Sequence, residues 1–368
     1  MLGDQKILQG ATMYFSKTAL RGVGGATACF LLLIALAAAA PPQPVRDRQE
    51  EPPQLERFEF SEPHMGVTFK LLFYAPDSET ANRAAQAAFK RIAGLDRALS
   101  DYDPDSELNE LSLTAGQGRN VPVSDDLWRV LTGAKGVSQQ SHGAFDVTVG
   151  PIVRLWRRAR RQQKLPSPER LEQALKAVGH VLLRMDAEAK TVQLTQPAMQ
   201  LDLGGIAKGY AADEALQVLE THGIDRALVD ASGDLAFGAP PPGREGWRIG
   251  IAPLAADAPP SRFLLLAHQA VATSGDAWQF IELDGRRYSH IVDPRTGIGL
   301  TTRSSVTVLA PCGMRADALA SALSVLGPER GLALADRLDR VAALFVVQED
   351  DRTVAYSSRR MKQLIGEL

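Results

Sequence analysis

The sequence is poor in cysteine, with only Cys29 and Cys312 among its 368 residues. Cys29 falls in an N-terminal segment that we expect to be removed, so Cys312 would remain alone and no internal disulfide could form. The chain also lacks a dominant charge, since 41 basic residues face 43 acidic ones for a net charge of -2. No whole-molecule field therefore favours nucleic acid or an anionic membrane, and any anion site must be local.

The N-terminal segment lacks an apolar run long enough to cross a bilayer. The run Ala26 to Ala40 is shorter than the roughly 20 residues that a membrane helix needs. It follows a basic leader containing Lys17 and Arg21, and it ends in small residues before Pro41. This profile predicts that residues 1–40 are a signal peptide for export, with an uncleaved inner-membrane anchor as the alternative.

The composition changes twice along the rest of the chain. Residues 41–57 are rich in proline, glutamine and charge, which predicts a disordered tether. From Phe58 onward no comparable linker occurs, and helix-like and strand-like segments are intermixed. This pattern predicts a single α+β domain over residues 58–368.

Apolar spacing and capping residues predict two clear helices, Ser78–Leu99 and Ser167–Val178, the second with Ser167 as its N-cap and Gly179 as its stop. The basic run Arg154 to Lys164 is interpreted as a solvated helical face, or alternatively as a docking surface for an acidic partner. Strands are predicted where β-branched and apolar residues cluster, at Val181–Met185, Thr191–Leu194, Ala227–Val229, Phe263–Ala267, Ser305–Leu309 and Val341–Val347.

The segment Asp202 to Tyr210 is predicted to end a strand, turn through Gly204-Gly205 and enter a helix. Glycines let the backbone approach a phosphate, the first helical turn points N–H groups at it, and Lys208 adds a positive charge. The alternative is an ordinary strand-to-helix corner.

Asp317 and Ser321 stand four residues apart in a segment of strong helix formers, so they share one helix face. A carboxylate and a hydroxyl are oxygen ligands suited to magnesium, which keeps some waters and is completed by substrate phosphates. The alternative is an acid favoured by the helix dipole beside a small packing residue.

Three other segments carry chemistry in loops. His290 lies in HIVDPRTG. Such a histidine is suited to accept a proton near neutral pH, and the alternative is a structural histidine. Asp293 either orients the imidazole or caps the turn. Phe145 and Asp146 place an aromatic ring beside a carboxylate, and the Ser232-Gly233-Asp234 segment fits a β-turn.

Together and in this order, these segments resemble the ApbE family of FAD:protein FMN transferases, from Met65-Gly66 to about Gly327. The motifs that carry the resemblance are MG at Met65, SDYDPDSELNEL at Ser100, GAFDVTVGP at Gly143, DLGGIAKGYAAD at Asp202, GD at Gly233, TSGD at Thr273, HIVDPRTG at His290 and ADALASAL at Ala316.

The resemblance implies an α+β fold of two T-fold-like repeats and a set of site residues. Ser321 stands where threonine is commoner in the family, and it keeps the hydroxyl. His290 would be the base. The metal ligands would be the carbonyl of Gly205 with Asp317 and Ser321, and the FAD contacts would be Met65, Tyr102, Ala144, Phe145, Asp146, Lys208 and the backbone of Ile291.

The activity implied by the resemblance is Mg²⁺-dependent transfer of FMN from FAD to a Thr or Ser hydroxyl of an acceptor protein, with release of AMP. Family acceptors are exported electron-transfer subunits with an Asp-x-Ser/Thr-Gly-Ala-Thr-like motif, which implies a periplasmic location. Two alternatives stay open: an Mg²⁺-dependent FAD pyrophosphatase, and a non-catalytic exported flavin-binding protein.

Overall fold

The computed structural model describes residues 54–251, 254, 260, 262–275 and 280–365. The predicted signal peptide and residues 41–53 of the predicted tether lie outside this part of the chain. No helix among the described residues is both long enough and apolar enough to cross a bilayer.

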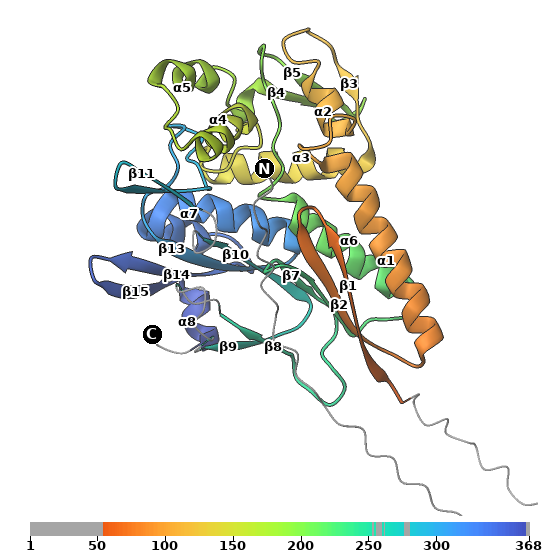
Figure 1. The fold of residues 1–368 in the computed structure, drawn as a ribbon. Coiled ribbons are helices and arrows are strands. Elements are labelled where there is room, and N and C mark those ends of the chain that lie inside the picture. Colours follow the sequence, from red (N-terminus) through yellow and green to blue (C-terminus); the bar gives the residue numbers. More distant parts are fainter. Residues whose placement is uncertain (1–53, 252–253, 255–259, 261, 276–279, 366–368) are drawn as a thin grey trace, which may run out of the picture. The chain divides into compact units, whose positions relative to one another are not determined.

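An eight-stranded sheet in the order β1-β2-β6-β7-β10-β13-β14-β15 forms the centre of the fold (Figure 1). Every neighbouring pair in this sheet is antiparallel. The strands are β1 (Glu56–His64), β2 (Val67–Ala75), β6 (Ala227–Ala231), β7 (Leu235–Phe237), β10 (Gln269–Gly275), β13 (Ser304–Ala310), β14 (Ala342–Glu349) and β15 (Arg352–Ser357).

Both faces of the sheet are covered. Helices α1 (Ser78–Leu99), α6 (Ala207–Thr221) and α7 (Gly313–Ala335) lie on one face, as Figure 1 shows. The other face packs against α8 (Arg359–Ile365) and the ribbon of β8 (Trp247–Gly250) and β9 (Phe263–Leu266). Successive residues of a strand point to opposite faces of the sheet. Phe345 of β14 therefore packs in the core on the helix side, and Leu344 packs in the core on the opposite face.

The remaining elements lie beyond the helix layer or at its edge. Helix α3 (Asp125–Gln140) packs on α7. The other elements are α2 (Glu107–Ser112), α4 (Gly150–Gln162), α5 (Pro168–Leu175), the 3₁₀ turn η1 (His180–Leu182), a small sheet of β3 (Val121–Pro122), β5 (Thr191–Leu194) and β4 (Leu183–Asp186), and the hairpin of β11 (Phe280–Leu283) and β12 (Arg286–Ser289).

The predicted α+β class is confirmed, and the two T-fold-like repeats stay a prediction. Several boundaries differ from those expected, and the strands β6, β9, β13 and β14 are each one or two residues longer or shorter at an end. Strand β1 begins at Glu56 rather than after residue 57, because Glu56 pairs with Ala75 of β2. Helix α5 ends at Leu175, before the expected stop. The predicted strand Val181–Met185 begins as the 3₁₀ turn η1 and becomes β4 only at Leu183.

Candidate functional site

The glycine corner leads into α6 as the sequence predicted, with one correction. The segment before it is not a strand but an isolated bridge between Val149 and Gln200. Asp202 Oδ1 then accepts the Gly204 N–H at 2.9 Å and shapes the turn. Helix α6 begins at Ala207, and its N-cap residue supplies no side-chain cap. Two N–H groups of the first turn already have acceptors, because Ala207 donates to the Leu203 carbonyl at 2.9 Å and Gly209 donates to Asp317, so the anion site at this turn stays a prediction.

Helices α6 and α7 approach closely because glycine stands at their contact. A Cβ on Gly209 would collide with the carbonyl oxygen of Gly313 and lie 2.9 Å from Asp317 Cβ. The Gly209 N–H donates to Asp317 Oδ2 at 3.2 Å. A Cβ on Gly205 would lie 2.9 Å from Ser321 Oγ. The close packing thus brings the three predicted metal ligands to the start of α6.

Phe145 joins this group from another loop. Its Cε2 atom lies 3.3 Å from the position that a Cβ on Gly205 would take. The Ser274 Oγ of β10 lies 3.5 Å from Ser321 Oγ, which adds a second hydroxyl beside the predicted ligand. We call Phe145, Gly205, Asp317 and Ser321 the corner cluster. Its members come from three motifs that are distant in sequence, since Gly205 follows Phe145 by 60 residues and Asp317 follows Gly205 by 112.

Buried charge surrounds the corner cluster. Lys208 forms an ion pair with Asp234, and Asp234 and Asp317 are each 3% exposed. Burial, together with the neighbouring Asp234 carboxylate, raises the pKa of Asp317 to about 8. Burial also raises the pKa of Asp234. For Lys208, burial lowers the pKa, but the Asp234 and Asp317 carboxylates outweigh this effect and raise it.

The donor set of the cluster fits a hard divalent cation. Two buried carboxylates face a single ammonium group, so ionisation of both acids leaves an uncompensated negative charge. The described residues contain no group of three or more His, Cys, Asp or Glu side chains placed to hold a metal. A cation here would depend on a carboxylate, a hydroxyl, a backbone carbonyl and substrate oxygens, which is a donor set typical of Mg²⁺.

Asp146 organises the loop that presents Phe145. Its carboxylate accepts the Thr148 N–H at 2.9 Å, the Thr148 hydroxyl at 2.7 Å and the His180 N–H at 2.6 Å. Asp146 and Ala144 are both buried. These hydrogen bonds show a structural role for the Asp146 side chain, and the predicted FAD contacts of both residues stay predictions.

Met65 and Tyr102 lie in loops outside the contacts of the corner cluster, with Met65 partly buried against the core and Tyr102 exposed. Met65 and Gly66 form the turn between β1 and β2 with φ of 50° and 73°, which explains the need for glycine there. The Met65 N–H donates to Asp96 of α1 at 2.8 Å. Tyr102 is 76% exposed, and the Arg157 guanidinium lies over one face of its ring. Tyr102 is therefore accessible to a ligand, and the FAD contact of Met65 stays a prediction.

The loop that carries His290 is held by contacts on both sides. His290 is exposed at the end of β12. The Ile291 N–H donates to Ser289 Oγ at 3.1 Å, and the Ile291 carbonyl accepts the Leu300 N–H at 2.9 Å. The Asp293 carboxylate accepts two N–H groups of the Arg295 guanidinium at 2.8 and 2.7 Å. Asp293 also accepts the backbone N–H of Arg295 at 2.9 Å, which supports turn capping as its role.

Two residues of this region were missed by the sequence reasoning. Asp234 was interpreted only as part of a β-turn, yet it is the buried partner of Lys208. Arg157 was assigned to a solvated helical face, yet it forms ion pairs with Asp101 and Asp202. Neither partnership is visible from spacing, because each joins elements far apart in the chain. The only available signal for Asp234 was its place directly after Gly233 in a motif.

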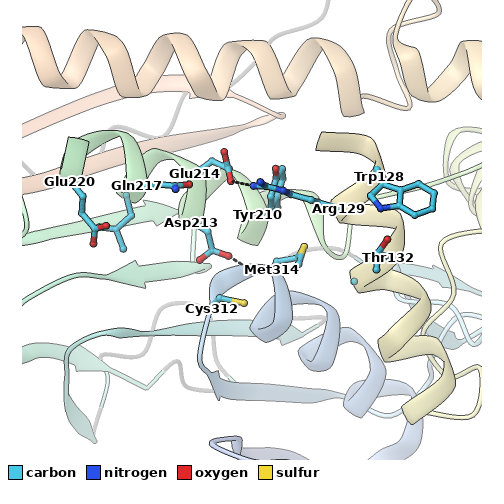
Figure 2. A pocket seen from close by; sticks show the side chains of 12 residues that line it. Trp128, Arg129, Thr132, Tyr210, Asp213, Glu214, Gln217, Glu220, Cys312 and Met314 are labelled. Atoms are coloured by element: carbon cyan, nitrogen blue, oxygen red, sulfur yellow. Dashed lines mark hydrogen bonds and ion pairs between the residues drawn. The ribbon is translucent and has the colours of Figure 1, made fainter. Parts of the chain in front are cut away.

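A cavity of about 640 Å³ lies between α3, α6 and the start of α7, and it contains none of the predicted site residues (Figure 2). Asp213 of α6 lies in its wall and accepts the N–H groups of Gly313 at 2.6 Å and Met314 at 2.9 Å. Burial raises the pKa of Asp213 to about 6 in spite of these two bonds. Because Cys312 provides no side-chain cap, Asp213 caps α7 from the neighbouring helix. The contact fixes the start of the helix that carries Asp317.

The glycine contact between α6 and α7 gives a stability prediction with a matched control. Gly209→Ala is expected to lower the free energy of unfolding by about 1–3 kcal/mol, because the new Cβ meets the Gly313 backbone and Asp317. Gly94→Ala, inside α1 with nothing within 4 Å of its Cβ position, is expected to raise it by about 0.5–1 kcal/mol. Urea unfolding measures both, and a Gly209→Ala variant that is as stable as the wild type or more stable would contradict the close approach.

Comparison with known proteins agrees with the motif pattern. The family model described as the ApbE family matches residues 65–345. An FAD:protein FMN transferase of Treponema pallidum is 36% identical over 278 residues, which cover 72% of this chain and 76% of that protein. One of Vibrio cholerae is 32% identical over 320 residues, covering 84% and 93%. Among solved structures, the apo flavinyl transferase ApbE of Pseudomonas stutzeri superposes with a TM-score of 0.76 at 32% identity, covering 86% of this chain and 98% of that one.

Proposed function

The chain belongs to the ApbE family, and on this premise we propose that it is an FAD:protein FMN transferase, which moves FMN from FAD to a hydroxyl group of an acceptor protein. The observation that carries the proposal is the corner cluster with Lys208. Buried carboxylates, hydroxyls and a lysine meet there at the start of α6. Such a place suits the diphosphate of a dinucleotide.

The Gly205 carbonyl, Asp317 and Ser321 would hold Mg²⁺ in this proposal. The cation would supply positive charge that offsets the charge on the phosphoryl oxygens. Lys208 adds a second positive charge, and its ion pair with Asp234 fixes the ammonium group in position.

The remaining predicted residues bind the nucleotide or move the proton. Met65, Tyr102, Ala144, Phe145, Asp146 and the Ile291 backbone would contact FAD. In the transfer, the acceptor oxygen forms a bond to the phosphorus on the FMN side, the bond from that phosphorus to the bridging oxygen breaks, and AMP leaves with the electron pair. His290 accepts the proton of the acceptor hydroxyl.

The acceptor and the location complete the proposal. We expect the acceptor to be an exported electron-transfer subunit with an Asp-x-Ser/Thr-Gly-Ala-Thr-like motif. The basic leader and the short apolar run of residues 1–40 support export to the periplasm, with anchoring to the inner membrane as the alternative.

The direct test is incubation of the full-length chain with FAD, Mg²⁺ and a peptide carrying the acceptor motif. We expect a mass increase on the peptide equal to one FMN group, located on its threonine or serine, and equimolar AMP. Free FMN and AMP with an unmodified peptide would instead identify a pyrophosphatase. Intact FAD would identify a non-catalytic flavin-binding protein. EDTA provides the control for the metal requirement.

A further inference from the structure

The side chain of Arg157, in α4, contacts two loops of the candidate site. Its guanidinium donates to Asp101, donates to Asp202 at 3.1 Å, and lies 4.2 Å from the centre of the Tyr102 ring. The side chains of Arg157, Asp101 and Asp202 are only 26%, 14% and 10% exposed. These contacts set Arg157 apart from its neighbours on the basic helix, such as Arg161, which is exposed.

The two carboxylates that Arg157 holds belong to the two loops on either side. Asp101 directly precedes Tyr102, while Asp202 accepts the Gly204 N–H at 2.9 Å and so shapes the turn before Gly205. Burial raises the pKa of Asp202, and the nearby Asp101 raises it further, whereas Arg157 lowers it. The guanidinium thus keeps two partly buried carboxylates together that would otherwise repel each other.

The Tyr102 ring has the geometry of a stacking platform. The residue is 76% exposed, although one face of its ring is covered by the guanidinium. A planar guanidinium beneath an aromatic ring fixes the ring orientation through cation–π attraction and stacking. The opposite face of a ring held in this way is available to a second planar group.

We propose that Arg157 is a positioning residue for the dinucleotide. It fixes Tyr102 as a platform for one of the ring systems of FAD, and through Asp202 it ties that platform to the Gly204-Gly205 turn. This inference rests on the proposed function. It also predicts that lysine cannot replace Arg157, because an ammonium group neither stacks as a plane nor donates to two carboxylates with the same fork geometry.

The test compares Arg157→Lys, Tyr102→Ala and the double variant in the full-length chain. The lysine variant keeps the charge between Asp101 and Asp202, so we expect an unfolding midpoint close to that of the wild type. Its dissociation constant for FAD, measured by quenching of flavin fluorescence with EDTA present, is expected to rise about tenfold. KM for FAD should rise in parallel, whereas kcat at saturating FAD should change less than about threefold. Arg161→Lys is the matched control and should bind FAD as the wild type does.

The double variant decides whether Arg157 acts through Tyr102. If it does, Arg157→Lys has little further effect on FAD binding once Tyr102 is alanine. Full additivity, or wild-type FAD binding by Arg157→Lys alone, would overturn the inference. A failure of the proposed function would give a different result, namely no FMN transfer by the wild-type chain. The comparison of FAD dissociation constants would still test the role of Arg157 in that case.

Discussion

Asp317→Asn is expected to reduce FMN transfer by about 10²- to 10³-fold, the range seen when one key electrostatic group is removed from an active site. The change removes a negative charge from the proposed metal site while keeping the shape of the side chain. The amide oxygen can still accept the Gly209 N–H that Asp317 accepts now. The loss should therefore come from weaker cation binding and not from unfolding. Transfer rates measured over a range of Mg²⁺ concentrations should show a raised Mg²⁺ requirement.

The matched control for this prediction is Asp336→Asn at the other end of α7. Asp336 is the C-cap residue of that helix and pairs with Arg359, away from the corner cluster. The Asp336→Asn substitution should leave the transfer rate and its Mg²⁺ dependence unchanged. A wild-type rate for Asp317→Asn at every Mg²⁺ concentration, with an unchanged unfolding midpoint, would show that this carboxylate holds no catalytic cation.

Local sequence signals predicted the elements whose stability is decided locally. The bounds of α1 are those expected, because Asp77 caps the helix through the Thr80 N–H and its buried alanines recur at helical spacing. The bounds of β5 are also those expected, since β-branched residues and alternation agree there. Strands β1 and β2 were not assigned, because the many charged residues of β1 hide its alternation and its pairing depends on the turn at Met65-Gly66.

The site residues also fall into those that the sequence predicts and those that only the fold brings together. The four-residue spacing brought forward Asp317 and Ser321, and the resemblance added Gly205; the close packing of α6 and α7 places the three together. The roles of Asp234 and Arg157 depend on which loops meet in space, so composition and periodicity carry no signal for them. The sequence left two roles open for Asp293, orienting His290 or capping the turn, and the Arg295 N–H that Asp293 accepts at 2.9 Å supports the second.

His290→Ala is expected to lower FMN transfer by about 10²- to 10⁴-fold, the range for loss of a general base. The loop around it should survive the change, because its supports are elsewhere. Trp156 Nε1 donates to the Gly297 carbonyl at 2.8 Å, and Asp293 and Arg295 hold the turn. FAD binding should therefore stay close to that of the wild type. Single-turnover transfer at saturating FAD isolates the chemical step, and fluorescence quenching measures binding.

Two further results separate a proton acceptor from a residue that only shapes the loop. Added imidazole should restore part of the transfer rate of His290→Ala, because a free base can take the acceptor proton where the side chain is missing. His222→Ala is the control: His222 lies at the far end of α6 and bonds to the Val218 carbonyl, so its loss should leave the rate unchanged and unresponsive to imidazole. A wild-type single-turnover rate for His290→Ala would remove His290 from the chemistry and leave the acceptor proton to another group.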